Sequence, residues 1–174
     1  NFEAAAKLIK EGYSPLPEIM IPLVGSVEEF KHQKNIVIDI AQSIEKKINI
    51  KLDYLIGTMI ELPRACITAD SISKEADFFS FGTNDLTQTV YGFSRDDVGS
   101  FLPNYLDNQL LDGDPFQSID QEGVGELVKI GTEKGRKANP NLKIGICGEH
   151  GGDPESINFF HKIGLDYVSC SPFR

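Results

Sequence analysis

Two acidic residues follow apolar runs that have the length of buried strands. Glu61 and Asp85 are 24 residues apart (85 − 61), about the length of one strand and the helix after it. We therefore expect them at neighbouring strand ends with their carboxylates converging. Two carboxylates suit Mg²⁺, which takes one or two of them from the protein and completes its octahedron with substrate oxygens and water. The spacing predicts a magnesium site at Glu61 and Asp85.

Each acidic residue alone also has a simpler interpretation. Asp85 could be the N-cap of the helix that starts there, and Glu61 could be a solvated residue before Pro63. The run Gly82-Thr83-Asn84 directly precedes Asp85 and favours the site. Backbone N–H groups at a glycine turn and a helix start attract an anionic ligand.

Cys147 lies in the run GICG, where the glycines allow backbone to approach a ligand and leave the thiol uncovered. A thiol near its ordinary pKa is protonated at neutral pH, so Cys147 is predicted to act as a general acid. Free cysteines are more often small buried hydrophobes, which is our interpretation of Cys66 and Cys170. The next two residues, Glu149 and His150, are predicted to orient the thiol or a metal-bound water.

The elements that must position these residues alternate between strand and helix. Strands are predicted at residues 17–24, 54–61, 77–81, 142–147 and 166–170. Helices are predicted at 2–11, after the cap residue Ser26, from Pro63, after the 82–85 turn, at 118–138 and from Pro154. Because parallel neighbours need a crossover that a helix supplies, the sheet should be parallel. Five such strands fit an open doubly wound sheet or part of a barrel, and both bind ligands at the carboxyl ends of the strands.

Two further segments have distinct patterns. The long helix after Ser26 is amphipathic, and the apolar residues that fall near one face are Val27, Phe30, Ile36, Ile40 and Ile44. The segment 92–115 is rich in Asp, Asn, Gly and Pro and is too long for an ordinary strand–helix connection. We expect that segment to form a lid or an interface.

Composition and charge exclude several classes of protein. The 174 residues suit one domain, and the net charge of −9 disfavours nucleic acid and anionic membrane surfaces as partners. No apolar run approaches the roughly 20 residues of a membrane span, and the N-terminal residues do not resemble a signal peptide. The three cysteines lack CxxC spacing, which argues against a disulfide framework or a structural zinc site. No GxGxxG or GxxxxGKS/T loop occurs, so no nucleotide site is expected. A soluble protein of a reducing, cytoplasmic compartment is the resulting expectation, although an organelle address could lie on termini outside this sequence.

Four motifs together resemble the phosphoenolpyruvate-utilising enzymes. They are GTMIELPRA at 57–65, FGTNDLTQ at 81–88, GICGEHGGDP at 145–154 and DYVSCSPFR at 166–174. Within the family, the EHGGDP continuation is most similar to the dikinase branch, which interconverts ATP, phosphate and pyruvate with AMP, diphosphate and phosphoenolpyruvate. The synthase branch is the alternative. The resemblance covers nearly the whole chain.

This resemblance implies an α/β fold, a partial (β/α)8 TIM barrel that comprises roughly the last five strands with their helices. Residues 1–174 would form the C-terminal part of the phosphoenolpyruvate- and pyruvate-binding barrel domain, with no second domain. A complete barrel typically needs about 250 residues. The implied partners are pyruvate or phosphoenolpyruvate, a phosphohistidine domain of the same enzyme, and a second copy in a homodimer through the barrel.

The resemblance also implies roles for individual residues. Glu61 and Asp85 would hold Mg²⁺, and Cys147 would be the acid that protonates the enolate carbon. Substrate binding is implied for Glu61, Gly82, Thr83, Asn84 and Asp85. The family's two substrate-holding arginines, its phosphohistidine and its nucleotide-binding region have no counterpart in this sequence. We therefore expect the isolated chain to be inactive, and a module that serves only assembly is a further hypothesis.

Overall fold

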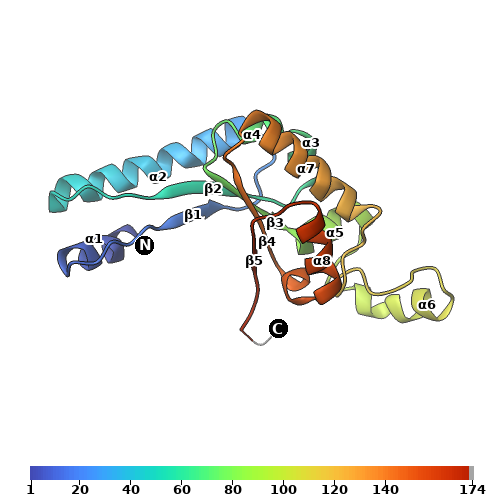
Figure 1. Ribbon diagram of the computed structural model, residues 1–174. Helices are drawn as coiled ribbons and strands as arrows, with labels where there is room; N and C mark the ends of the chain where they lie inside the picture. Colours follow the sequence, from blue (N-terminus) through green and yellow to red (C-terminus); the bar gives the residue numbers. More distant parts are fainter. Residues whose placement is uncertain (173–174) are drawn as a thin grey trace.

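The computed structural model describes residues 1–172 and contains one parallel five-stranded sheet in the order β1-β2-β3-β4-β5 (Figure 1). The strands are β1 (Glu18–Ile21), β2 (Leu55–Ile60), β3 (Phe78–Gly82), β4 (Lys143–Cys147) and β5 (Tyr167–Ser169). From β2 onward, each strand pairs in parallel with the strand before it in the chain. All five predicted strands are confirmed. A doubly wound sheet reverses its strand order at a switch point, so this unreversed order is the winding of a barrel.

Helices fill every connection between the strands. They are α1 (Phe2–Lys10), α2 (Val27–Ile48), α3 (Pro63–Ile67), α4 (Ala69–Ile72), α5 (Thr83–Tyr91), α6 (Leu102–Asp107), α7 (Val124–Ala138) and α8 (Pro154–Lys162), with short 3₁₀ turns η1 (Val98–Ser100) and η2 (Glu149–Gly152). In Figure 1, α2, α3, α4 and α7 lie along the same side of the sheet. The helix predicted at 118–138 begins later, at Val124.

The helix starts follow from local sequence signals. Ser26 caps α2, and its hydroxyl accepts the N–H of Glu29 at 3.2 Å. Pro63 and Pro154 stand in the first turns of α3 and α8, where a missing N–H costs nothing. These predicted starts are confirmed.

The main core lies between the sheet and the helices that cover it. Phe79 and Phe81 are completely buried on β3 and face α7. A methyl group on Gly131 or Gly135 of that helix would approach these two rings to 3.0–3.1 Å. The two glycines therefore let α7 sit close to the sheet.

The amphipathic face of α2 agrees with the prediction only in part. Phe30 is completely buried as predicted, whereas Ile36 and Ile40 are 43% and 50% exposed and Ala41 is completely buried instead. Ala41 belongs to a second, smaller core with Phe2 of α1. The far half of α2 packs against α1 in this smaller core, and this contact changes which residues of the helix are buried.

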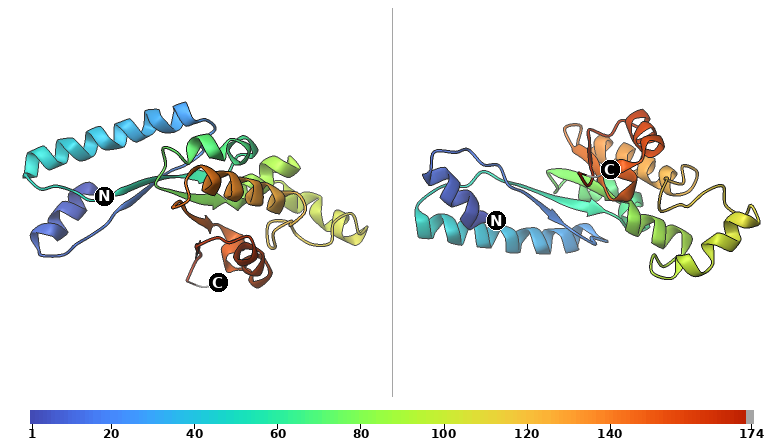
Figure 2. Two further views of the ribbon diagram at one scale, coloured as in Figure 1. Left: turned by 45° about the horizontal axis from the view of Figure 1, so that its top comes forward. Right: turned by 90° about the horizontal axis from the view of Figure 1, so that it is seen from below.

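Residues 93–117, which we call the arm, project from the main body at the end opposite α1 (Figure 2). Gly92, with φ of +67°, ends α5 in the left-handed conformation and lets the chain turn outward. Within the arm, Phe93, Phe101 and Tyr105 stack edge to face, with ring centroids 4.9–6.1 Å apart. The arm thus carries its own aromatic cluster.

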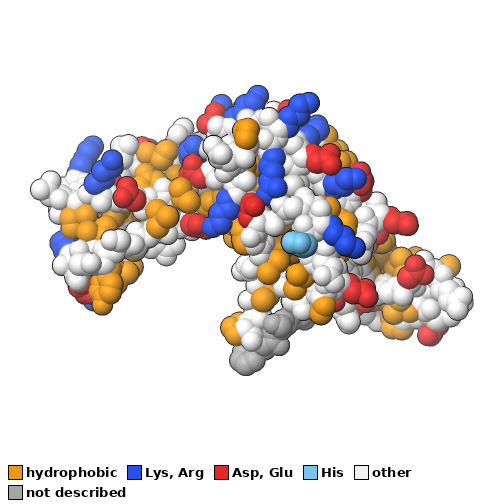
Figure 3. Space-filling model, in the orientation of Figure 1, with side chains coloured by type: hydrophobic (Ala, Val, Ile, Leu, Met, Phe, Trp, Pro, Cys, Tyr) orange, Lys and Arg blue, Asp and Glu red, His pale blue; other side chains and the backbone are white. Residues whose placement is uncertain are grey.

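The molecule is arched, with a hollow between the end formed by α1 and α2 and the end formed by β5 (Figure 3). Hydrophobic side chains are exposed at the α1 and α2 end in the same view. Among residues 1–172, no helix is both long and apolar enough to span a bilayer.

Candidate active site

The strand register places three of the predicted site residues side by side. Gly82 pairs with Cys147 across β3 and β4, and Ile60 pairs with Phe81 across β2 and β3. Glu61 follows Ile60 directly, so it lies beside Gly82. Glu61, Gly82 and Cys147 therefore form one row at the carboxyl edge of the sheet, which we call the strand-end row.

Glu61 is 2% exposed and is held by backbone on two sides. Its Oε1 accepts the N–H of Leu23 at 2.7 Å, and a Cβ placed on Gly82 would lie 2.5 Å from its Oε2. Leu23 adopts a left-handed conformation with φ of +55°. Glycine at position 82 is needed because any larger residue would displace the Glu61 carboxylate.

Asp85 lies in the first turn of α5, next to Glu61. Burial raises the pKa of Glu61, and the charge and hydrogen bonding of Asp85 raise it further, against the lowering effect of the Leu23 N–H. The two carboxylates converge as predicted. Asp85 is not the N-cap of α5, because Gly82 occupies that position, so that simpler interpretation is wrong. Its Oδ1 instead accepts a hydrogen bond from Gln88 Nε2 at 2.9 Å.

Cys147 is partly buried at the end of β4, and its Sγ lies 3.7 Å from the carbonyl oxygen of Phe81. Burial raises the pKa of this thiol, the negative charges of Glu61 and Asp85 raise it further, and a hydrogen bond with Ser80 lowers it. The strand register places the thiol in the same row as Glu61, where the charges of both carboxylates act on it.

The other two cysteines differ from each other. Cys66 is fully buried, and burial raises its pKa to about 12, in agreement with its prediction as a small buried hydrophobe. Cys170 is exposed, so the same prediction is wrong for it. It follows β5, which has a strand neighbour on one side only within the described residues.

Thr83 and Asn84, the first two residues of α5, face the segment after β4. Thr83 is buried, and its Oγ1 lies 2.7 Å from His150 Nδ1. Asn84 Oδ1 accepts the N–H of Glu149 at 3.4 Å and packs against Gly148, which has φ of +118°. The turn after β3 is thus joined to the turn after β4.

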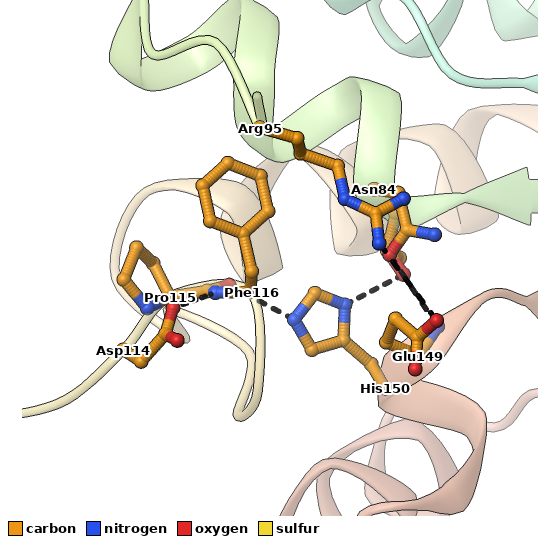
Figure 4. Close-up of polar contacts among 8 residues, drawn as sticks. Asn84, Arg95, Asp114, Pro115, Phe116, Glu149 and His150 are labelled. Atoms are coloured by element: carbon orange, nitrogen blue, oxygen red, sulfur yellow. Dashed lines mark hydrogen bonds and ion pairs between the residues drawn. The ribbon is translucent and has the colours of Figure 1, made fainter. Parts of the chain in front are cut away.

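His150 does not have the role predicted for it. Its ring is completely buried, and its two nitrogens are engaged by Thr83 and by the carbonyl oxygen of Pro115, 2.9 Å from Nε2 (Figure 4). Neither nitrogen is left to orient the thiol or a metal-bound water. The Glu149 carboxylate lies 3.8 Å from the Arg95 guanidinium.

Sequence reasoning missed several residues that support this site. Gln88 is one helical turn from Asp85, a spacing that could have identified it. Leu23 and Pro115 act through backbone atoms, for which a sequence carries no side-chain signal.

The donor set fits Mg²⁺. Within residues 1–172 no group of three or more His, Cys, Asp or Glu side chains could hold a metal ion. Mg²⁺ does not need such a cage, because one or two carboxylates with water and substrate oxygens suffice. Two neighbouring carboxylates, of which Glu61 is buried and Asp85 half-buried, repel each other unless a cation or a shared proton lies between them. Glu61 and Asp85 therefore suit a divalent cation.

Comparison with known proteins places this geometry in a family. The family model described as PEP-utilising enzyme, PEP-binding domain, matches residues 3–174. The chain belongs to this family. The resemblance read from the four motifs is confirmed, and so is the fold class, an α/β arrangement that forms part of a (β/α) barrel.

The relatives of this PEP-binding domain include plant enzymes. The chain is 58% identical over 173 residues to "Pyruvate, phosphate dikinase, chloroplastic" of Flaveria bidentis, a match of 99% of this chain and 18% of the relative. It is equally identical, over the same share of both chains, to "Pyruvate, phosphate dikinase 1, chloroplastic" of Arabidopsis thaliana. "Pyruvate, phosphate dikinase 2" of Zea mays is also 58% identical, with 20% of it covered. The chain therefore spans about a fifth of the length of these curated relatives.

Proposed function

We propose that this chain forms the substrate-binding part of a pyruvate, phosphate dikinase. The strand-end row with Asp85 beside it is the observation that carries this proposal, supported by the family and by the relatives' names. Residues 1–174 would be the C-terminal part of the barrel domain. The whole enzyme would interconvert ATP, phosphate and pyruvate with AMP, diphosphate and phosphoenolpyruvate.

In this proposal Glu61 and Asp85 hold Mg²⁺ and, with it, the substrate. Bound there, the ion would supply Lewis-acid stabilisation of negative charge on the pyruvate oxygens. Glu61 suits this role because the Leu23 N–H fixes one carboxylate oxygen and Gly82 leaves room for the other.

Gly82, Thr83 and Asn84 bind the substrate beside the carboxylates. The first turn of α5 presents backbone N–H groups without helical partners, which attract an anionic ligand such as pyruvate or phosphoenolpyruvate. Thr83, which is buried, and Asn84, which is half-buried, are anchored to the next turn, so their orientations are set before a ligand arrives.

Cys147 transfers a proton between its thiol and the substrate carbon that becomes the methyl group of pyruvate. When pyruvate is formed, the thiol gives its proton to the methylene carbon of the enolate and is left as a thiolate. When phosphoenolpyruvate is formed, the thiolate takes a methyl proton, and the enolate oxygen bonds to phosphorus as the phosphorus–nitrogen bond of a phosphohistidine breaks. That phosphohistidine would lie on another domain of the same enzyme.

We also propose a homodimer through the barrel and a reducing, cytoplasmic setting. Exposed apolar side chains such as Ile36 and Ile40 support self-association. The three cysteines are all unpaired in the described residues, which supports a reducing compartment.

The test is exchange of the pyruvate methyl protons with solvent, followed by proton NMR with and without Mg²⁺ in a full-length protein that carries this sequence. Glu61→Gln, Asp85→Asn and Cys147→Ala should each slow the exchange by about 100-fold or more. Cys170→Ala is the matched control, since this thiol is exposed and should leave the rate unchanged. Normal exchange in Glu61→Gln and Asp85→Asn would refute the metal assignment, and normal exchange in Cys147→Ala would show that its thiol only packs.

A further inference from the structure

His150 joins the arm to the turn after β3 that contains residues 82–85, which we call the active-site turn. One ring nitrogen lies 2.7 Å from the Thr83 hydroxyl of α5 and the other lies 2.9 Å from the Pro115 carbonyl of the arm. Figure 4 shows the two ring nitrogens of His150 on opposite sides of the ring, one of them directed toward Pro115. The ring is completely buried, so solvent does not replace either partner.

The direction of both hydrogen bonds follows from the chemistry of the partners. A carbonyl oxygen only accepts, so Nε2 of His150 must carry a proton and donate it to Pro115. Burial lowers the pKa of His150 and favours the neutral ring, in which Nδ1 is then an acceptor. The Thr83 hydroxyl therefore donates its proton to Nδ1 and turns its lone pairs away from the ring.

The Pro115 carbonyl is itself held in place. The N–H of Phe116 donates to Asp114 Oδ1 at 2.8 Å, and the Phe116 side chain is buried. Just beyond the arm, Ser118 donates to Asp153 Oδ2 at 2.8 Å, and the N–H of Ile119 donates to the Ser156 hydroxyl at 2.9 Å. This end of the arm is thus fixed to the start of α8.

The other end of the arm is tied to the same active-site turn. Gln88 accepts the N–H of Arg95 at 2.8 Å with its Oε1 and donates to Asp85 at 2.9 Å with its Nε2. Both ends of the arm are therefore anchored close to the first turn of α5. The Pro115 carbonyl is thus held in one position, from which it can orient the His150 ring.

We propose that His150 is a positioning residue: the arm sets its ring through the Pro115 carbonyl, and the ring in turn sets the direction of the Thr83 hydroxyl. This proposal rests on the proposed function, because a fixed hydroxyl direction matters for catalysis only where Thr83 contacts the substrate.

Two substitutions of His150 distinguish a ring that orients the Thr83 hydroxyl from a ring that only attaches the arm. An asparagine amide reaches the place of Nδ1 and can accept from Thr83, whereas a glutamine amide reaches the place of Nε2 and can donate to Pro115. In the full-length protein, His150→Asn should keep the kcat of pyruvate methyl exchange within about threefold, and His150→Gln should lower it about tenfold, the value of one lost hydrogen bond. Thr83→Val should match His150→Gln, and the double variant should be no slower than either single variant.

The reverse order, with His150→Gln active and His150→Asn impaired, would overturn the proposal and show that the ring only attaches the arm. Equal losses in both variants would overturn it as well, because they would show that the shape of the ring matters and its bond to Thr83 does not.

Crystal structures of the two variants give a readout that does not depend on activity. The Thr83 side chain should keep its rotamer in His150→Asn and leave it in His150→Gln. An unchanged rotamer in both variants would refute the inference whatever the kinetics. Absence of methyl exchange in the unsubstituted protein, with the Thr83 rotamer responding as expected, would instead refute the proposed function alone.

Discussion

The strand-end row and the arm are held in place by different means. Glu61, Gly82 and Cys147 owe their positions to backbone pairing between adjacent strands, which fixes every residue in register. The arm has no strand partner within the described residues and is held by its aromatic cluster and by single side chains such as Gln88 and His150. Changes in the row should therefore affect both fold and chemistry, while changes in the arm should have local effects.

The largest difference between the two regions should appear in stability. Phe81→Ala removes a completely buried ring beside the row and should lower the free energy of unfolding of this domain by about 3–5 kcal/mol. Phe101→Ala in the arm removes edge-to-face contacts of a partly exposed ring and should cost about 1 kcal/mol. Urea unfolding of the full-length protein, with hydrogen exchange to locate the change, measures both. Equal losses of unfolding free energy in the two variants would contradict the expectation that the region of the row contributes more to stability than the arm.

Replacement of a glycine by alanine should have very different effects on the rate of pyruvate methyl exchange in the two regions. In Gly82→Ala the new methyl group meets the Glu61 carboxylate, and a displacement of about 1 Å should slow pyruvate methyl exchange on the order of 100-fold. Gly99→Ala in the arm meets nothing within 4 Å and should leave the rate unchanged. An active Gly82→Ala variant would show that Glu61 can move without consequence.

An intermediate effect on Mg²⁺ dependence is expected where the arm meets Asp85, beside the strand-end row. Gln88→Met keeps the length of the side chain but removes both hydrogen bonds, so Asp85 loses the partner that orients it. The Mg²⁺ concentration that gives half-maximal methyl exchange should rise about tenfold, the value of one hydrogen bond to a charged group. A Mg²⁺ titration of the exchange rate measures this, and an unchanged midpoint would confine Gln88 to a role in the arm.

Removal of the Arg95 side chain should have the smallest effect on stability and on the rate of methyl exchange. Its guanidinium lies 3.8 Å from the Glu149 carboxylate, and both side chains are partly exposed, so the pair should contribute less than about 1 kcal/mol. Arg95→Ala keeps the backbone N–H that Gln88 binds. Thermal unfolding and methyl exchange should both stay close to those of the unsubstituted protein. A large loss would mean that side-chain charge, and not backbone, holds the arm.

Features with local causes were predictable from the sequence. Helix starts at Ser26, Pro63 and Pro154 depend on a cap hydroxyl or a proline ring, which act within one turn. The convergence of Glu61 and Asp85 was also predictable, because parallel strands joined by helices bring their carboxyl ends to one edge.

Features with distant causes were not predictable. The partners of His150 lie 67 and 35 residues away, and one of them is a backbone carbonyl. Ile36 and Ile40 follow the same period as the buried Phe30, but the packing of α1 covers Ala41 and leaves these two residues exposed. Periodicity shows that a helix has an apolar side, and the neighbouring elements decide which residues are covered.

The strand order has a consequence for how this domain is made. From β2 onward, each described strand pairs with the one just before it in the chain, so once β1 and β2 have paired no described strand depends on a later one for its first partner. During synthesis, which proceeds from the N-terminus, a strand can add to a sheet that already exists as soon as it leaves the ribosome. The sheet can therefore grow one unit at a time during translation.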